Sequence, residues 1–190
     1  MYRLIALSIL LITLSGCSSS SSPGGSGDTG VISSSFGTVK SGKVTLTGGD
    51  ASNYNGVLDT GYVGASPSII VNGVNTSTNY IMIVDSASTV ASPDGVSMTP
   101  RPGDPNNSVV LTVVDSEPVK QGAGIVVSLT IIKNGIAAGY GCTTTLGIGI
   151  DCGSNSISMD FSGRSITFTN MSVINQATST VMTLDGTLTW

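Results

Sequence analysis

Histidine is absent from this chain, so its three cysteines and eleven acidic residues are the first candidates for covalent or acid–base chemistry. Without histidine there is no Ser-His-Asp or Cys-His catalytic centre and no HExxH zinc site. The cysteines are Cys17, Cys142 and Cys152, and their spacing matches neither a CxxC redox motif nor a paired-CxxC zinc site. The sequence therefore predicts no metal site and no cofactor.

Cys17 follows a segment with the features of an export signal. Residues 1–3 include one basic side chain, and residues 4–14 form a predominantly apolar run without a charged residue. This run has the length of a signal-peptide core and is too short to span a bilayer, which takes about 20 apolar residues. The motif LSGC, which ends at Cys17, resembles the lipobox of bacterial lipoproteins. The resemblance implies cleavage before Cys17 and attachment of lipid to its thiol; an ordinary secretory leader is the alternative.

The lipobox resemblance also carries an expectation about location and partners. Ser18 follows the cysteine where lipoproteins kept at the inner membrane often carry Asp, which implies an outer-membrane anchor with the domain on the periplasmic or surface face. We expect the membrane to be a partner through this anchor, and an envelope protein or a glycan to be another. Nucleic acid is excluded as a partner, because the seven Lys and Arg are scattered and the net charge is -4.

Asp59 is the acidic residue whose neighbours point most directly to catalysis. The stretch VLDTG around it resembles the active-site loop of retroviral-type aspartic proteases, which are also all-β. In that family two such aspartates share a proton, so Asp59 would need its counterpart from a second chain. The residue after the glycine is usually small in that family and is Tyr62 here. We interpret Asp59 as a turn residue and predict no catalytic residue; a homodimeric retropepsin-like protease remains the alternative.

The elements that must position these residues fall into three parts. Residues 1–16 are predicted to be the signal peptide, and residues 17–35 the acylated cysteine with a flexible Ser/Gly tether. In residues 36–190, apolar residues alternate in short runs separated by Gly, Asn, Asp and Pro, with no helical period. This pattern predicts a single antiparallel β-sandwich of about nine to ten strands. A small closed β-barrel is the alternative fold.

The predicted strands differ in how clearly their ends are marked. They are residues 39–47, 56–63, 68–71, 80–84, 108–114, 124–133, 136–145, 156–161, 165–170 and 181–190. Asn134-Gly135 predicts a type I′ hairpin turn, because both of its positions favour positive φ. Residues 91–108 hold four of the seven prolines and have no period, which predicts a long loop.

The C-terminal third has two further resemblances. Residues 140–190, with their paired cysteines and the closing LDGTLTW, look like the C-terminal part of small uncharacterised Gram-negative lipoproteins. That resemblance implies a β-sheet envelope lipoprotein and no known activity. Trp190 at the end of an alternating strand resembles the last strand of outer-membrane β-barrels, so a barrel component is a further alternative. If Cys17 is acylated, Cys142 and Cys152 are the remaining thiols and should form a disulfide in an oxidising compartment.

Replacing Cys17 removes the thiol that would carry the lipid. We expect Cys17→Ser to accumulate as an uncleaved precursor or to be released into the soluble fraction, because the acyl anchor is lost. Fractionation of cells expressing the tagged chain, followed by immunoblotting, measures both outcomes. Ser18→Ala is the control and should behave like the unchanged chain. A Cys17→Ser chain that is processed and membrane-bound as usual would contradict the lipoprotein interpretation.

Overall fold

The computed structural model describes residues 35–37, 39–49, 51–54, 56–58, 60–66, 69–71, 74–76, 79–91, 98–115, 124–144, 151–153 and 156–190. The predicted signal peptide, Cys17, Asp59 and the tether up to residue 34 lie outside the described residues. The described residues all belong to one compact unit, Val31–Trp190. Within these ranges no helix is long and apolar enough to cross a membrane.

The described chain is built from β-strands, with one short 3-10 turn at Ala51–Tyr54. The strands are β1 (Ser35–Gly37), β2 (Ser41–Gly48), β3 (Val57–Leu58), β4 (Thr60–Ser66), β5 (Ile69–Val71), β6 (Val74–Thr76), β7 (Asn79–Asp85), β8 (Thr89–Ala91), β9 (Thr99–Arg101), β10 (Asn107–Asp115), β11 (Ile125–Lys133), β12 (Ile136–Thr143), β13 (Ile157–Asp160), β14 (Ser165–Ile174) and β15 (Val181–Thr189). Eleven of them form one sheet in the order β1-β4-β7-β10-β11-β12-β14-β15-β2-β3, with β13 paired to β14. All of its pairings are antiparallel, and the prediction of an all-β antiparallel fold is confirmed.

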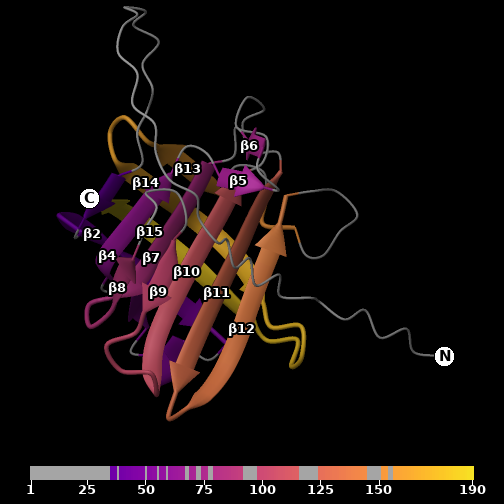
Figure 1. Ribbon diagram of the computed structural model, residues 1–190. Coiled ribbons are helices and arrows are strands. Elements are labelled where there is room, and N and C mark those ends of the chain that lie inside the picture. The colour runs from indigo at the N-terminus through magenta and orange to yellow at the C-terminus, as the bar shows by residue number, and fades with distance from the viewer. Residues whose placement is uncertain are drawn as a thin grey trace, which may run out of the picture. The chain divides into compact units, whose positions relative to one another are not determined.

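The sheet curls so that its two halves face each other across one core. We call β1, β4, β7, β10, β11 and β12 the front layer, and β13, β14, β15, β2 and β3 the back layer; Figure 1 shows the yellow C-terminal strands crossing behind the front layer. Leu111 and Leu129 of the front layer belong to the same hydrophobic cluster as Leu46, Phe168 and Leu184 of the back layer. Each layer therefore removes the apolar face of the other from water, at about 25 cal/mol per Å² of apolar surface.

The two layers meet at a junction with very little strand pairing. β12 and β14 share a single ladder pair, Gly141↔Ile174. At the other end of the sheet, β3 in the back layer ends at Leu58 and β4 in the front layer begins at Thr60. Because one residue separates these strands along the chain, the two ends of the curled sheet lie near each other.

The last strand has the predicted alternation. Met182, Leu184 and Leu188 of β15 are fully buried, and the residues between them are half-buried or exposed. Gly186 shares the buried face at a φ of 138°, where a Cβ would lie 2.1 Å from the carbonyl oxygen of Lys43. Glycine is required at this position, and it lets β2 approach β15 closely.

The predicted hairpin turn between β11 and β12 is confirmed. Asn134 and Gly135 have φ angles of 52° and 77°, as a type I′ turn requires. The turn is held against the start of β10, because Gly135 N donates to the Asn106 carbonyl oxygen (2.9 Å) and Asn134 N donates to Asn107 Oδ1 (3.2 Å).

The prediction of a long loop at residues 91–108 is wrong at residues 91, 99–101 and 107–108, which belong to strands. β9 lies within it and pairs with β8 to form a separate hairpin, and β10 begins at Asn107. Pro100 is tolerated in β9 because short edge strands need few backbone donors. Residues 92–97 lie outside the described residues.

β14 is longer than the alternation of its first half predicts. It continues past residue 170 to Ile174, because a register shift between Phe168 and Met171 restores the buried positions on the core side. Met171 and Val173 are then fully buried. Asn170, at a φ of 47°, lies within the shift.

A second, smaller hydrophobic cluster lies on the outer face of the front layer. Met82 and Val84 of β7 are buried there with Val90 of β8, and Tyr80 and Met98 pack against them. Burial raises the pKa of Tyr80. The hairpin of β8 and β9 therefore covers part of the outer face of the front layer.

Candidate functional site

The outer face of the back layer carries mainly hydroxyl side chains. Alternate residues of β2 and β15, such as Val44 and Leu188, are fully buried in the core, so the residues between them point outward. We call this outward surface the hydroxyl face. Its hydroxyl residues are Ser41, Thr45 and Thr47 of β2, Ser158 of β13, Ser165, Thr167 and Ser172 of β14, and Thr183, Thr187 and Thr189 of β15.

These hydroxyl groups lie in rows that cross the strands. The rows are Ser41–Thr189–Ser165, Thr187–Thr167–Ser158 and Thr47–Thr183–Ser172. Within them, Thr167 Oγ1 and Thr187 Oγ1 are hydrogen-bonded at 2.9 Å, and Ser41 Oγ is hydrogen-bonded to Thr189 Oγ1. Opposite side chains of antiparallel strands have their Cβ atoms about 5 Å apart. The face therefore presents a regular grid of groups that both donate and accept hydrogen bonds.

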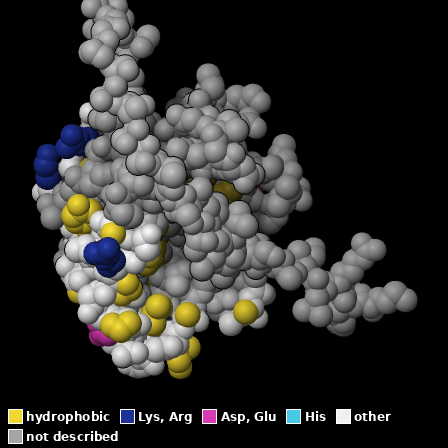
Figure 2. Space-filling view, viewed as in Figure 1, with side chains coloured by type: hydrophobic (Ala, Val, Ile, Leu, Met, Phe, Trp, Pro, Cys, Tyr) yellow, Lys and Arg dark blue, Asp and Glu magenta, His cyan; other side chains and the backbone are white. Residues whose placement is uncertain are grey.

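Few charged side chains lie on the hydroxyl face, and two of them, Asp185 and Asp160, accept hydrogen bonds from backbone N–H groups. Asp185 Oδ1 accepts a hydrogen bond from Asn170 N (3.0 Å), and Asp160 Oδ1 accepts one from Gly163 N (2.8 Å). Lys43 of β2 is the basic residue on this face. On the side of the molecule seen in Figure 2, Lys and Arg side chains also lie in separate places rather than in one patch.

A buried carboxylate at the end of β7 has a structural role. Asp85 Oδ1 accepts hydrogen bonds from Ala87 N (3.0 Å) and Ser88 Oγ (2.8 Å), and Asp85 Oδ2 accepts one from Val109 N (2.7 Å). The carboxylate thus closes the turn after β7 and continues the pairing with β10. A buried carboxylate needs hydrogen-bond donors, and these three are protein groups.

Gly61, the glycine of the Asp-Thr-Gly stretch, packs against this same turn. A Cβ at residue 61 would lie 2.5 Å from the Cα of Ser86. A register shift between Thr60 and Tyr62 marks an irregularity of β4 at this position. The glycine therefore has a packing role in this structure. Asp59 itself lies outside the described residues.

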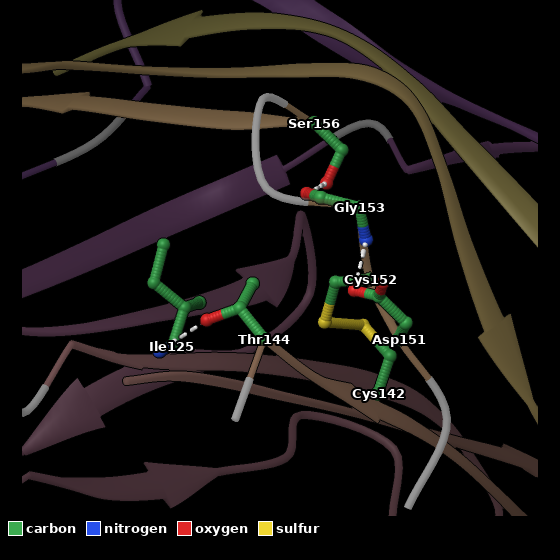
Figure 3. Close-up of a disulfide and its surroundings, with 7 residues drawn as sticks. All are labelled: Ile125, Cys142, Thr144, Asp151, Cys152, Gly153 and Ser156. Carbon is green, nitrogen blue, oxygen red and sulfur yellow. Dashed lines mark hydrogen bonds between the residues drawn. A yellow bond between two sulfur atoms is a disulfide. The ribbon is translucent and has the colours of Figure 1, made fainter. Parts of the chain in front are cut away.

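The structure contains the predicted Cys142–Cys152 disulfide, and both cysteines are buried. Cys142 belongs to β12 of the front layer, and Cys152 lies in the segment that leads to β13 of the back layer. The bond therefore ties the layers together beside their single ladder pair (Figure 3).

Hydrogen bonds continue this connection from the disulfide into the back layer. Cys152 N donates to the Thr143 carbonyl oxygen (3.2 Å), and Thr169 N of β14 donates to the Ser156 carbonyl oxygen (2.8 Å). Between them, Ser156 Oγ donates to the Gly153 carbonyl oxygen at 2.7 Å, as Figure 3 shows. The segment from the disulfide to β13 is thus bonded to both layers.

Two further described carboxylates, Asp104 and Asp151, accept hydrogen bonds at turns. Hydrogen bonds from the Asn107 side chain and the Asn106 backbone lower the pKa of Asp104, which precedes β10. Asp151 Oδ1 accepts from Gly153 N at 2.8 Å. Across the described ranges, no three side chains of the metal-binding types His, Cys, Asp and Glu lie close enough to hold an ion.

The structure brings together the two predicted disulfide residues and contains a surface that the sequence pattern alone does not predict. The signal was present as Ser/Thr-x-Thr in three strands, for example Thr45-Leu46-Thr47. It became a surface only when the strand order placed β2, β15 and β14 side by side. No protein-family profile matches the chain, and neither a curated protein nor a solved structure shows significant similarity to it.

Removing the disulfide should weaken the attachment of the layers without changing the fold. We expect the double variant Cys142→Ser, Cys152→Ser to lose about 2 to 3 kcal/mol of unfolding free energy, as for loops of this length. Urea unfolding followed by Trp190 fluorescence measures the change. Alkylation of the unreduced protein before mass spectrometry is the independent check, and labelling of both Cys142 and Cys152 would contradict the disulfide.

Proposed function

We propose that this chain is a lipid-anchored protein of the outer membrane that acts by noncovalent binding rather than by catalysis, and that its hydroxyl face binds a neutral glycan. The anchor is supported by the LSGC motif that ends at Cys17. A site of action outside the cytoplasm, on the periplasmic or surface face, is supported by the Cys142–Cys152 bond, because disulfides persist in oxidising compartments.

The hydroxyl face is the observation that carries the proposed binding function. A serine or threonine hydroxyl donates one hydrogen bond and accepts two, and the hydroxyl groups of a sugar do the same. A neutral ligand can therefore exchange hydrogen bonds with several rows without the cost of burying a charge. A polyanionic ligand would need clustered Arg or Lys, and Lys43 is the one basic residue among the hydroxyl rows.

The composition of the hydroxyl face favours a glycan over a protein at this surface. Protein interfaces are enriched in Tyr, Trp, Phe, Met and Arg and depleted in Ser. Ten of the outward side chains on these strands are serine or threonine, and Lys43, Asp160, Asp185 and the exposed Val181 lie among them. Its hydrogen bonds, such as that between Thr167 and Thr187, hold the hydroxyl groups in place before a ligand arrives, which lowers the entropic cost of binding.

The alternative of a homodimeric aspartic protease has less support. The Asp-Thr-Gly stretch has a packing explanation, because Gly61 lies against the turn at Ser86 with no room for a side chain. The step from Leu58 to Thr60 also carries the chain from one layer to the other. The interpretation of Asp59 as a turn residue is therefore our preferred proposal.

Replacing hydroxyl groups by methyl groups tests the binding surface without changing its shape. We expect the triple variant Thr167→Val, Thr183→Val, Thr187→Val to bind a neutral glycan about 100-fold more weakly, at about 1 kcal/mol for each lost hydrogen bond. Co-sedimentation of the lipidated protein, in detergent, with two insoluble uncharged glycans, chitin and cellulose, measures binding. Valine favours strands as threonine does, so the melting temperature should not fall.

The control variant carries the same three changes on the front layer. Thr112→Val, Thr130→Val and Thr143→Val remove half-buried hydroxyls from β10, β11 and β12, and this variant should bind like the unchanged protein. Equal binding by both triple variants would show that the hydroxyl face is not the binding surface. No sedimentation of the unchanged protein with either glycan would contradict the glycan proposal, while leaving the membrane anchor untouched.

A further inference from the structure

The edge of β12 that faces away from β11 carries backbone groups at regular intervals. A two-residue turn joins β11 to β12, and Lys133↔Ile136 is the first ladder pair after it. In such a turn the N–H of Ile136 bonds back to Lys133, so Ile136 and every second residue after it face β11. The residues between them, beginning with Ala137, direct their N–H and C=O groups to the opposite edge.

Described residues occupy only the second half of this opposite edge. Gly141 pairs with Ile174 at the end of β14, and the Thr143 carbonyl oxygen accepts a hydrogen bond from the disulfide segment. No described residue pairs with Ala137 or Gly139 on this side. In Figure 1, β12 is the orange strand at the margin of the front layer.

This part of the edge has none of the features that usually prevent strand edges from associating. Between Asn134 and Thr143 there is no charged residue and no proline, the two residue classes that most often protect edges. A Cβ built at Gly139 would meet nothing within 4 Å. Ile136 is 76% exposed, the highest value among the large hydrophobic residues described as exposed. Among the described residues this part of the edge is therefore unpaired and uncharged, and Ala137, Ala138 and Gly139 are small residues.

We propose that this edge, at Ala137 and Gly139, is a self-association site at which a second copy of the chain adds its own β12 in antiparallel orientation. A two-fold axis beside Ala138 pairs Ala137 with Gly139 of the second copy and Gly139 with Ala137 of the second copy. Each pair exchanges two hydrogen bonds, so all four unpaired backbone groups of each chain are satisfied. The interface is isologous, as two-fold dimers require.

A second copy is the partner that this edge fits best, because the pattern is complementary to itself. Ala137 and Gly139 lie on either side of Ala138. A two-fold axis beside Ala138 therefore places each of them opposite the other residue of the second copy. The register also places Ile136 opposite Tyr140 of the second copy, on the same side of the extended sheet. The added strand ends where Gly141 is already paired with Ile174. This surface is separate from the hydroxyl face.

Cysteine substitution across the proposed axis tests the pairing directly. At a pair of this type the two Cα atoms lie about 4.5 Å apart, within the range that a disulfide bridges. We expect full-length Ala138→Cys, in membranes, to run as a dimer on non-reducing gels and as a monomer after reduction. Thr130→Cys is the matched control, since Thr130 lies on β11 opposite Gly139, and it should remain monomeric.

A charge placed on the edge gives a second measurement that does not depend on an added thiol. Ala137→Lys should lower the mass of the detergent-solubilised protein from two chains to one in analytical ultracentrifugation, and Thr130→Lys should leave two chains. A single chain for the unchanged protein, or equal cross-linking of Ala138→Cys and Thr130→Cys, would overturn the proposal. A monomer with the amides of Ala137 and Gly139 protected from hydrogen exchange would also overturn it, because a segment of the same chain would then occupy the edge.

Discussion

One shared hydrophobic core holds the two layers of this sheet together, and the other features of the structure depend on it. Strand pairing cannot do this, because β12 and β14 contribute a single ladder pair where the layers join. Apolar side chains hold the layers together instead. They form one cluster, which includes Leu111 and Leu129 of the front layer and Leu46, Phe168 and Leu184 of the back layer. The Cys142–Cys152 bond reinforces the junction at its weakest point. The fold is thus a single curled sheet whose layers are attached by burial of apolar surface and by one covalent link.

The same constraint determines where functional surfaces can lie. Since one side of every long strand is committed to the core, the outward positions are free to vary, and on β2, β14 and β15 they became hydroxyl residues in rows. The junction has a second consequence. β14 ends at Ile174, which is opposite Gly141, whereas β12 begins five residues earlier at Ile136. The first part of the β12 edge is therefore left without a described partner. The hydroxyl face and the β12 edge therefore both follow from how the sheet curls.

Much of the fold could be predicted from local patterns. The alternation of Met182, Leu184 and Leu188 identified β15 and its buried face, and Asn134-Gly135 identified the hairpin between β11 and β12. Local patterns failed where a longer-range contact decided the structure. β9 contains a proline and forms only because it pairs with β8, and β14 continues past Asn170 only because of its register shift.

The candidate sites were predictable only in part, for the same reason. The disulfide followed from counting cysteines in an exported chain. The hydroxyl face required the strand order β14-β15-β2, which places Thr167, Thr187 and Lys43 in one row. The open edge of β12 required knowing that Gly141, and not Ala137, pairs with β14. Strand order between segments distant in the sequence cannot be obtained from periodicity alone.

Native-state amide hydrogen exchange tests most directly whether one core holds both layers. If the layers share that core, the buried amides of Leu129 in the front layer and Leu184 in the back layer should open with the same free energy, equal to that of global unfolding. Both values should fall together as urea is added. A back layer that opens several kcal/mol more easily than the front layer, while Leu129 stays protected, would show two independent units and contradict a single shared core.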